Sequence, residues 1–206
     1  MVYPDRAAAG RALGTALEHL RGTRPLVLGL PRGGVPVAAA VCAAVDGELD
    51  VLLVRKLGLP EHPELAMGAL GETGIVVLNR DVIERAGVTD AAFAEVEQAE
   101  RAELARRQAT LRRSAPSPLT GRTVVLVDDG MATGATVLAA CRVARAQRPA
   151  HLVVAMPVAA PEAVDRVARE CDELVCLHTP ADLGGVGMAY EDFHQLDDAE
   201  VVALLR

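Results

Sequence analysis

Two adjacent acids, Asp128 and Asp129, are the residues of this sequence whose types and spacing most clearly suggest chemistry. They follow a run of branched apolar residues (124–127) and precede a stretch of small residues and threonines (130–136) that carries no charge. The apolar run predicts a buried strand, and the alanine-rich sequence from 136 predicts a helix. The acids therefore lie at the carboxyl end of a strand, which is where open α/β sheets bind ligands.

The residues after the acids suit a phosphate group. Free backbone N–H groups at the start of a helix, together with the helix dipole, favour a dianion. Thr133 and Thr136 add hydroxyl donors, and Gly134 lets the backbone approach a ligand closely. The segment is not a Walker loop, because G-x-x-x-x-G-K-[ST] is missing.

Two carboxylates beside a phosphate would repel it, so we expect Asp128 and Asp129 to face another part of the same ligand. Vicinal sugar hydroxyls fit, since a carboxylate accepts both hydroxyl protons and Mg²⁺ can share such a site. The segment thus indicates a ribose 5-phosphate. The alternative is that the acids only cap the following helix, although a cap needs just one of them.

The segment VVLVDDGMATGAT (124–136) resembles the phosphoribosyl-diphosphate signature of the type I phosphoribosyltransferases. Two further segments extend the resemblance in the order typical of that family. LGLPRGGVPVA (28–38) resembles the pyrophosphate loop, and LLVRKLGLP (52–60) resembles the Arg-Lys segment that precedes the flexible catalytic loop. The resemblance covers the chain from about residue 25 to about residue 147.

The resemblance implies a role for each matching residue. Asp128 and Asp129 would hold the ribose 2- and 3-hydroxyls and would share Mg²⁺ through ligand and water, while Arg55 and Lys56 would neutralise the pyrophosphate. Catalysis would depend on Arg55, Lys56 and Asp129, with segment 58–74 closing over the site. The pyrophosphate loop would consist of Arg32, Gly33 and Gly34 with a non-proline cis peptide, and the donor loop of Gly130, Met131, Ala132, Thr133, Gly134, Ala135 and Thr136.

The implied reaction transfers a phosphoribosyl group from 5-phosphoribosyl 1-diphosphate to a nitrogenous base or similar acceptor and releases pyrophosphate. Members that use 6-oxopurines carry an acid at the position of Ala132, so Ala132 argues against such an acceptor. Gly130 also departs from the family, which has a bulkier apolar residue there. The alternative function is that of a non-catalytic regulator that binds phosphoribosyl diphosphate or a nucleotide, and the intact Arg55-Lys56 segment favours the enzyme.

The acceptor site is less clearly marked. Tyr190 and Phe193 are the candidate base contacts, with Tyr3 as another, and ordinary packing of the chain ends is the alternative. Glu61, His62 and Glu64 are candidates for proton transfer, against a plain solvated loop. The remaining candidate site consists of Cys171, Cys176 and His178, which suggest zinc but lack a second ligand pair.

The order of predicted elements indicates an α/β fold with a parallel, Rossmann-like core sheet, a variable hood and a long helix inserted before the signature strand. We expect a single domain over 1–206, with a core at about 20–60 and 120–180 and a hood from 75–118 and the chain ends. Predicted helices are 5–20, 35–45, 90–113, 136–147, 161–170 and 198–206. Predicted strands are 25–30, 49–57, 75–79, 123–128, 151–159 and 173–177, with 58–74 as a loop.

Composition limits the partners. The chain has 206 residues and a formal net charge of −7, which disfavours general nucleic-acid binding because that depends on Lys and Arg. It has no Trp, two Phe and two Tyr, so the core is aliphatic. No run of apolar residues is long enough to cross a membrane. We expect a cytoplasmic homodimer.

Overall fold

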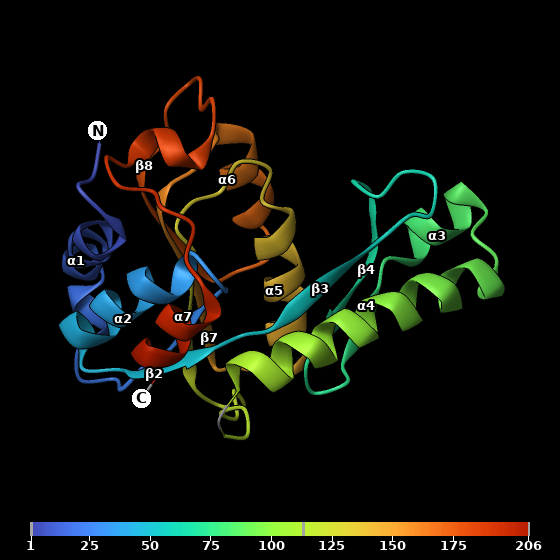
Figure 1. Cartoon of the computed structure of the whole chain (residues 1–206), viewed down its shortest axis with the longest axis horizontal. Coiled ribbons are helices and arrows are strands. Elements are labelled where there is room, and N and C mark those ends of the chain that lie inside the picture. The colour runs from blue at the N-terminus through green and yellow to red at the C-terminus, as the bar shows by residue number, and fades with distance from the viewer. Residues whose placement is uncertain (1, 113, 206) are drawn as a thin grey trace.

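A parallel sheet of five strands lies at the centre of the larger of two lobes (Figure 1). The computed structural model describes residues 2–112 and 114–205. The strand order is β2 (Glu48–Val51), β1 (Leu26–Gly29), β6 (Thr123–Val127), β7 (His151–Val158) and β8 (Glu173–His178). The chain moves outward from β1 to β2 and then in the opposite direction from β6 to β8. The order therefore reverses between β1 and β6, and the carboxyl end of such a switch point is a ligand site in open α/β sheets.

Helices cover both faces of this sheet. One face carries α1 (Arg6–Ala16) and α2 (Gly34–Val45), and the other carries α5 (Ala135–Ala146) and α6 (Pro161–Val167). Successive residues of a strand point to opposite faces. Val125 and Val127 of β6 accordingly pack with α1 and α2, whereas Val124 and Leu126 pack with α5. The continuous apolar strands of the sequence are explained by this burial on two sides.

The smaller lobe consists of a three-stranded antiparallel sheet and two helices (Figure 1). These elements are β3 (Val54–Gly58), β4 (Ala66–Gly71), β5 (Val76–Leu78), α3 (Arg80–Ala86) and α4 (Asp90–Leu111). The predicted strand 49–57 is wrong, because the chain leaves the core sheet after Val51 and enters the second sheet at Val54. The predicted loop 58–74 is also wrong in part, since its middle forms the buried strand β4.

The glycines of β4 explain the second error. A Cβ atom at Gly68 would lie 2.7 Å from the carbonyl oxygen of Val77 on β5, and one at Gly71 would lie 2.5 Å from Val143 of α5. Close approach of neighbouring elements requires glycine at both positions. The same glycines weaken the strand pattern in the sequence, which is why the sequence predicts a loop there.

The other predicted elements are confirmed within a few residues, and the α/β class with a parallel core sheet is confirmed. The long helix is α4, which ends at Leu111, and Arg113 of the predicted helix lies outside the described residues, as does Arg206 of the predicted terminal helix. The short elements η1 (Glu18–Leu20), η2 (Val186–Ala189) and α7 (Asp198–Leu204) complete the described chain. No helix within 2–112 and 114–205 is long and apolar enough to cross a membrane.

Arg112 clamps the smaller lobe to the core. Its guanidinium donates to the carbonyl oxygen of Val51 at 2.6 Å, to both carboxylate oxygens of Glu72 at 2.6 Å, and to Asp50. Glu72 in turn accepts the backbone N–H of Leu53 at 3.1 Å. Burial lowers the pKa of Arg112, but its bonds and charge contacts with Glu72 and Asp50 outweigh this, and the pKa is raised. Arg112 therefore connects the end of α4 to the end of β2, where the chain leaves the core sheet, and to Glu72, which directly follows β4.

Helix α1 packs on α2 through glycines. A Cβ atom at Gly10 would lie 2.5 Å from the carbonyl oxygen of Val37 and 2.7 Å from the Cβ of Ala40, and one at Gly14 would lie 2.5 Å from the Cβ of Ala44. The two backbones therefore approach more closely than side chains would permit. This contact fixes the start of α1, where Arg6 lies.

Gly10→Leu is expected to lower the free energy of unfolding by about 1–3 kcal/mol, because the added side chain overpacks the contact with α2. Urea unfolding followed by circular dichroism measures the change. Arg11→Leu, at an exposed position of the same helix, is the control and should change stability by roughly 0.5 kcal/mol or less. Equal losses in the two variants would contradict the role of Gly10 in this packing.

Candidate functional site

The acid pair and the loop after β1 are in direct contact at the switch point. The backbone N–H of Leu30 donates to the carbonyl oxygen of Val127, at 2.9 Å. A Cβ atom at Gly33 would overlap the carboxylate of Asp129, and one at Gly34 would lie 2.8 Å from the Cα of Asp128. The expected non-proline cis peptide is present, between Pro31 and Arg32. Two segments that lie far apart in the sequence thus form one surface.

The acid pair is an unusual electrostatic arrangement. One carboxylate oxygen of Asp128 accepts the backbone N–H of Asp129 at 2.9 Å. Burial, and then the charge of Asp129, raise the pKa of Asp128 well above its usual range. Burial also raises the pKa of Asp129, against the opposing effect of Arg6. Hydrogen-bond donors or a cation placed at the pair would favour its ionised form.

Arg6 is a site residue that the sequence motifs do not include. It is only 8% exposed, and its Nε donates to the carboxylate of Asp129 at 2.9 Å. Its Nη1 donates to the carbonyl oxygen of His194 at 3.0 Å, and its guanidinium lies 4.0 Å from the ring centroid of Phe193. Asp5 caps α1, so Arg6 occupies the first helical position, where the helix dipole disfavours a cation. A cation at this unfavourable position is the feature of the sequence that could have indicated an acidic partner for Arg6.

Three of the four aromatic side chains gather beside Asp129. The hydroxyl of Tyr190 donates to the carbonyl oxygen of Asp129 at 2.6 Å, and its ring centroid lies 5.8 Å from Tyr3 and 5.1 Å from Phe193. Burial, and then the charge of Asp129, raise the pKa of Tyr190, so its hydroxyl remains a donor. Phe193 is 37% exposed and lines a cavity of about 320 Å³ with Arg6 and Asp129.

The turn that begins α5 leaves its first backbone N–H groups free of intrahelical partners. Gly134 has φ +76°, a left-handed conformation that glycine adopts without strain, and the helix starts at Ala135. Ala132, Thr133 and Thr136 are exposed. Met131 is buried, and its backbone N–H donates to the carbonyl oxygen of Val158 at 3.0 Å, which anchors the turn on β7.

Gly130 has a packing explanation. A Cβ atom there would lie 2.5 Å from Val186 of η2 and 2.9 Å from Val158. The segment that carries Tyr190 therefore passes directly over Gly130, where a larger side chain would displace it. This contact accounts for the small residue after the acid pair.

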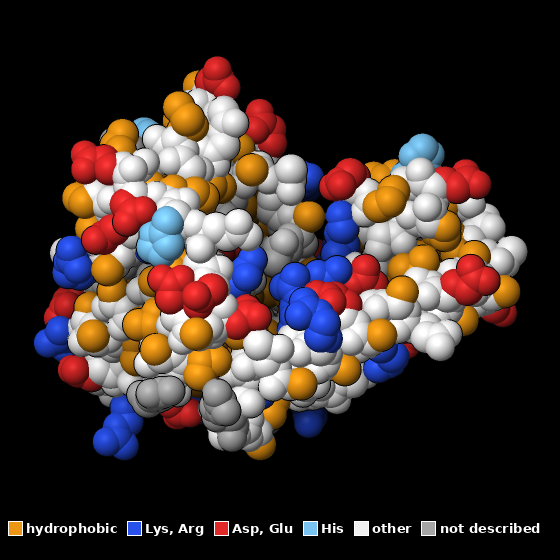
Figure 2. Space-filling view, in the orientation of Figure 1, with side chains coloured by type: hydrophobic (Ala, Val, Ile, Leu, Met, Phe, Trp, Pro, Cys, Tyr) orange, Lys and Arg blue, Asp and Glu red, His pale blue; other side chains and the backbone are white. Residues whose placement is uncertain are grey.

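Arg55 and Lys56 lie on β3 of the second sheet. The predicted strand 49–57 would have placed them at the end of a core strand instead. They line a cavity of about 540 Å³ together with Pro31 and Thr136. The Nε of Arg55 lies 2.5 Å from Glu100, and the Nζ of Lys56 lies 3.4 Å from Glu64. The cleft between the lobes, visible in Figure 2, therefore has the predicted cations on one wall and the start of α5 on the other.

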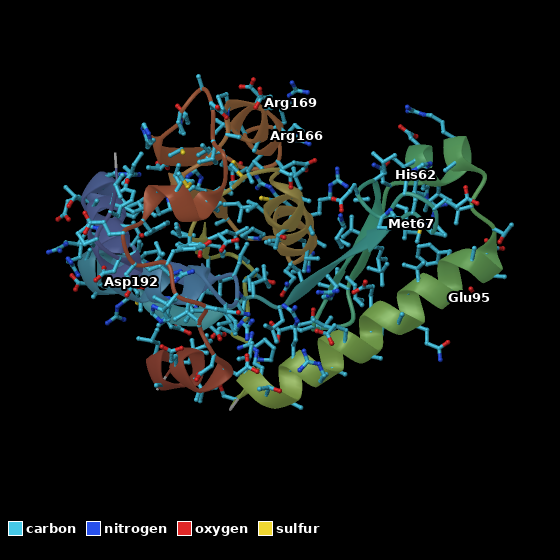
Figure 3. The ribbon with its side chains drawn as sticks, turned by 45° about the horizontal axis from the view of Figure 1, so that its top comes forward. His62, Met67, Glu95, Arg166, Arg169 and Asp192 are labelled. Atoms are coloured by element: carbon cyan, nitrogen blue, oxygen red, sulfur yellow. The ribbon has the colours of Figure 1, made fainter. Side chains whose placement is uncertain are left out.

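Several other candidates are not part of this site. Glu61 and His62 are exposed and do not line the 540 Å³ cavity, whereas Glu64 does. Figure 3 shows His62 on the smaller lobe, well away from the core sheet. In the part of the chain that the structure describes, no three His, Cys, Asp or Glu side chains come together as a metal site, so Cys171, Cys176 and His178 form none.

Comparisons with known proteins identify the family of this chain. A family model described as "Phosphoribosyl transferase domain" matches residues 5–192. The chain is 50% identical over 205 residues to a Mycobacterium tuberculosis (strain H37Rv) protein named as a candidate phosphoribosyl transferase, covering 99% of this chain and 46% of that protein. It thus spans about half the length of the curated relatives it matches. The crystal structure of TT1426 from Thermus thermophilus has 44% identity and a TM-score of 0.93, covering 100% of this chain and 98% of the other.

Proposed function

Because this chain belongs to the phosphoribosyl transferase domain family, we propose that it transfers a phosphoribosyl group from 5-phosphoribosyl 1-diphosphate to a nitrogenous base or similar acceptor and releases pyrophosphate. One observation carries the proposal. The acid pair, the start of α5 and the loop 31–34 meet at the switch point of the sheet. Each suits a different part of the same donor molecule.

Each part of the donor molecule faces protein groups that complement its charge or its hydrogen-bonding groups. Asp128 and Asp129 accept hydrogen bonds from the ribose hydroxyls. The backbone N–H groups of 132–136 and the hydroxyls of Thr133 and Thr136 donate to the 5-phosphate. The pyrophosphate lies against loop 31–34 and faces Arg55 and Lys56 across the cleft.

Loss of pyrophosphate from the anomeric carbon passes through an oxocarbenium-like state and requires no protein nucleophile. The chain contributes orientation of the donor and stabilisation of the negative charge that develops on the leaving group. Arg55 and Lys56 on β3 supply the positive charge that stabilises the leaving group, and Asp129 fixes the sugar. Closure of the smaller lobe against the core would exclude water from the cleft.

The acid pair also fits Mg²⁺. Its carboxylate oxygens are hard donors, and Mg²⁺ is commonly held by one or two carboxylates together with substrate phosphates and water. One oxygen of each carboxylate is already bonded, to the Asp129 N–H or to Arg6, which leaves the other available. When bound, Mg²⁺ would neutralise charge on the diphosphate.

The proposed acceptor lies beside the sugar, and Ala132 argues against a 6-oxopurine. Ala132 is exposed at the donor loop and carries no group that transfers a proton to such a base. Phe193 lies next to Asp129 and is the proposed base contact, while Tyr190, which is only 6% exposed, stacks against Phe193 and supports it from behind. Because Arg6 covers the Phe193 ring, stacking of a base on that ring requires Arg6 to move.

A turnover assay tests the proposal. The protein is incubated with 5-phosphoribosyl 1-diphosphate, Mg²⁺ and a panel of purines, pyrimidines and other nitrogenous acceptors, and pyrophosphate release is followed. We expect release with at least one acceptor and none without protein. Tight donor binding with no release across the panel would instead identify a regulator that senses the donor.

A further inference from the structure

Cations gather where α4 passes the loop after β1, although the chain has a net charge of −7 (Figure 2). Two neighbouring cavities, of about 540 and 320 Å³, both have Pro31 and Arg107 in their walls. The cations that line one or both of them are Arg32, Arg55, Lys56, Arg106 and Arg107. The sequence motifs account for the first three, and the proposed function does not use the two on α4.

Arg106 and Arg107 share a single carboxylate. The Nε of Arg106 lies 2.8 Å from Glu103, and the Nε of Arg107 lies 2.9 Å from the same side chain. Hydrogen bonds from Arg106 and then Arg107 lower the pKa of Glu103 to about 2. One carboxylate therefore balances two guanidinium groups, and one positive charge remains at this end of the cleft.

The neighbouring ion pairs are loose. Arg32 lies 3.8 Å from Asp198, and Lys56 lies 3.4 Å from Glu64, whose side chain is 88% exposed. Exposed pairs of this kind contribute little to stability. An incoming anion can therefore replace these carboxylates at small cost.

We propose that Arg106 and Arg107 of α4 join Arg32 in a binding site for pyrophosphate, either free or as the diphosphate part of the donor. The site rests on the proposed function for its biological ligand, and its position beside loop 31–34 extends the donor surface toward α4. A guanidinium group is planar and offers paired N–H donors that match two oxygens of one phosphate. The inserted helix thus contributes directly to ligand binding as well as supporting the hairpin.

The test measures calorimetric binding of pyrophosphate and of ribose 5-phosphate, each with Mg²⁺, to the wild-type protein and to Arg106→Gln/Arg107→Gln. We expect the Kd for pyrophosphate to rise by about tenfold or more, since charge-assisted contacts are lost. The Kd for ribose 5-phosphate, which has no diphosphate, should change by about twofold or less. Arg106→Lys/Arg107→Lys, which keeps the charge, should recover part of the pyrophosphate affinity.

Arg101→Gln is the matched control. Arg101 lies on the same helix and pairs with Glu97 four residues earlier, as Arg107 does with Glu103, but it lines neither cavity. Unchanged pyrophosphate affinity in the double variant, or an equal loss in Arg101→Gln, would overturn the site. Wild-type binding of pyrophosphate that the double variant loses, without binding of ribose 5-phosphate or the donor, would support the site and contradict the proposed function. Thermal unfolding confirms that each variant is folded.

Discussion

Asp128→Asn combined with Asp129→Asn is expected to abolish measurable binding of 5-phosphoribosyl 1-diphosphate, with a loss of about 100-fold or more in affinity. Asparagine keeps the shape of each side chain but replaces a carboxylate, which accepts two hydroxyl protons, by an amide with one acceptor oxygen. Each lost charge-assisted hydrogen bond is worth about 1.5–3 kcal/mol. The oxygens that fit Mg²⁺ are weakened as well. Calorimetric titration with the donor and Mg²⁺ measures the effect.

The control for this loss carries the same change of charge elsewhere. Asp46→Asn combined with Asp81→Asn replaces two exposed acids, one at the C-cap of α2 and one on α3 of the smaller lobe, and its donor affinity should stay within about twofold of the wild type. Unfolding curves exclude a general loss of structure, which is a concern because Arg6 loses its charged partner in the first variant. If the Asp128→Asn/Asp129→Asn protein is folded and its affinity for the donor is unchanged, the assignment of the acid pair to the sugar is wrong.

Arg112→Leu is expected to lower the free energy of unfolding by about 3–5 kcal/mol. The Glu72 side chain is 1% exposed and would lose the cation that Arg112 supplies, while Asp50 would lose its partnership with Arg112 too. A buried carboxylate without a compensating charge is costly, and the carbonyl oxygen of Val51 would lose its donor as well. Urea unfolding measures the change.

Arg101→Leu is the control for the clamp. Its pair with Glu97 lies on an exposed surface of the same helix, and such pairs contribute about 0–1 kcal/mol. Arg112→Leu/Glu72→Leu should recover part of the stability, because it removes the uncompensated charge together with its partner. A loss for Arg112→Leu no larger than that for Arg101→Leu would contradict the clamp.

The arrangement of the proposed donor surface was predictable because the residues that form it lie close together in the sequence. Strand, acid pair, turn and helix start lie within 124–136, and the loop 31–34 follows a strand that is apolar throughout. Arg6 was missed because it pairs with an acid 123 positions away. Tyr190 was identified as an aromatic candidate, yet its bond to the Asp129 carbonyl depends on how the C-terminal segment crosses Gly130.

The smaller lobe was the least predictable part for a related reason. Its strand β4 owes its glycines to contacts with β5 and α5, which no local pattern reveals. Its attachment depends on Arg112, whose partners at Asp50 and Glu72 come from two earlier segments. Arg112 lies at the end of a stretch that reads as an ordinary charged helix terminus. Only the folded chain shows that the Arg112 side chain is mostly buried, at 9% exposure, while that of Arg106 is 64% exposed.

Because Arg112 attaches one end of α4 to the core, any rotation of the smaller lobe would pivot around that end. Helix α4 has 22 residues and is therefore about 33 Å long, and the clamp holds the end that adjoins the core (Figure 1). A rotation of about 5° around that fulcrum carries the far end through about 3 Å but barely shifts residues close to it. Arg106 and Arg107 lie within two turns of the fulcrum, whereas the hairpin tip around 59–65 lies far along the arm. A rotation of this kind would therefore move the hairpin tip while Arg106 and Arg107 stayed beside the loop 31–34.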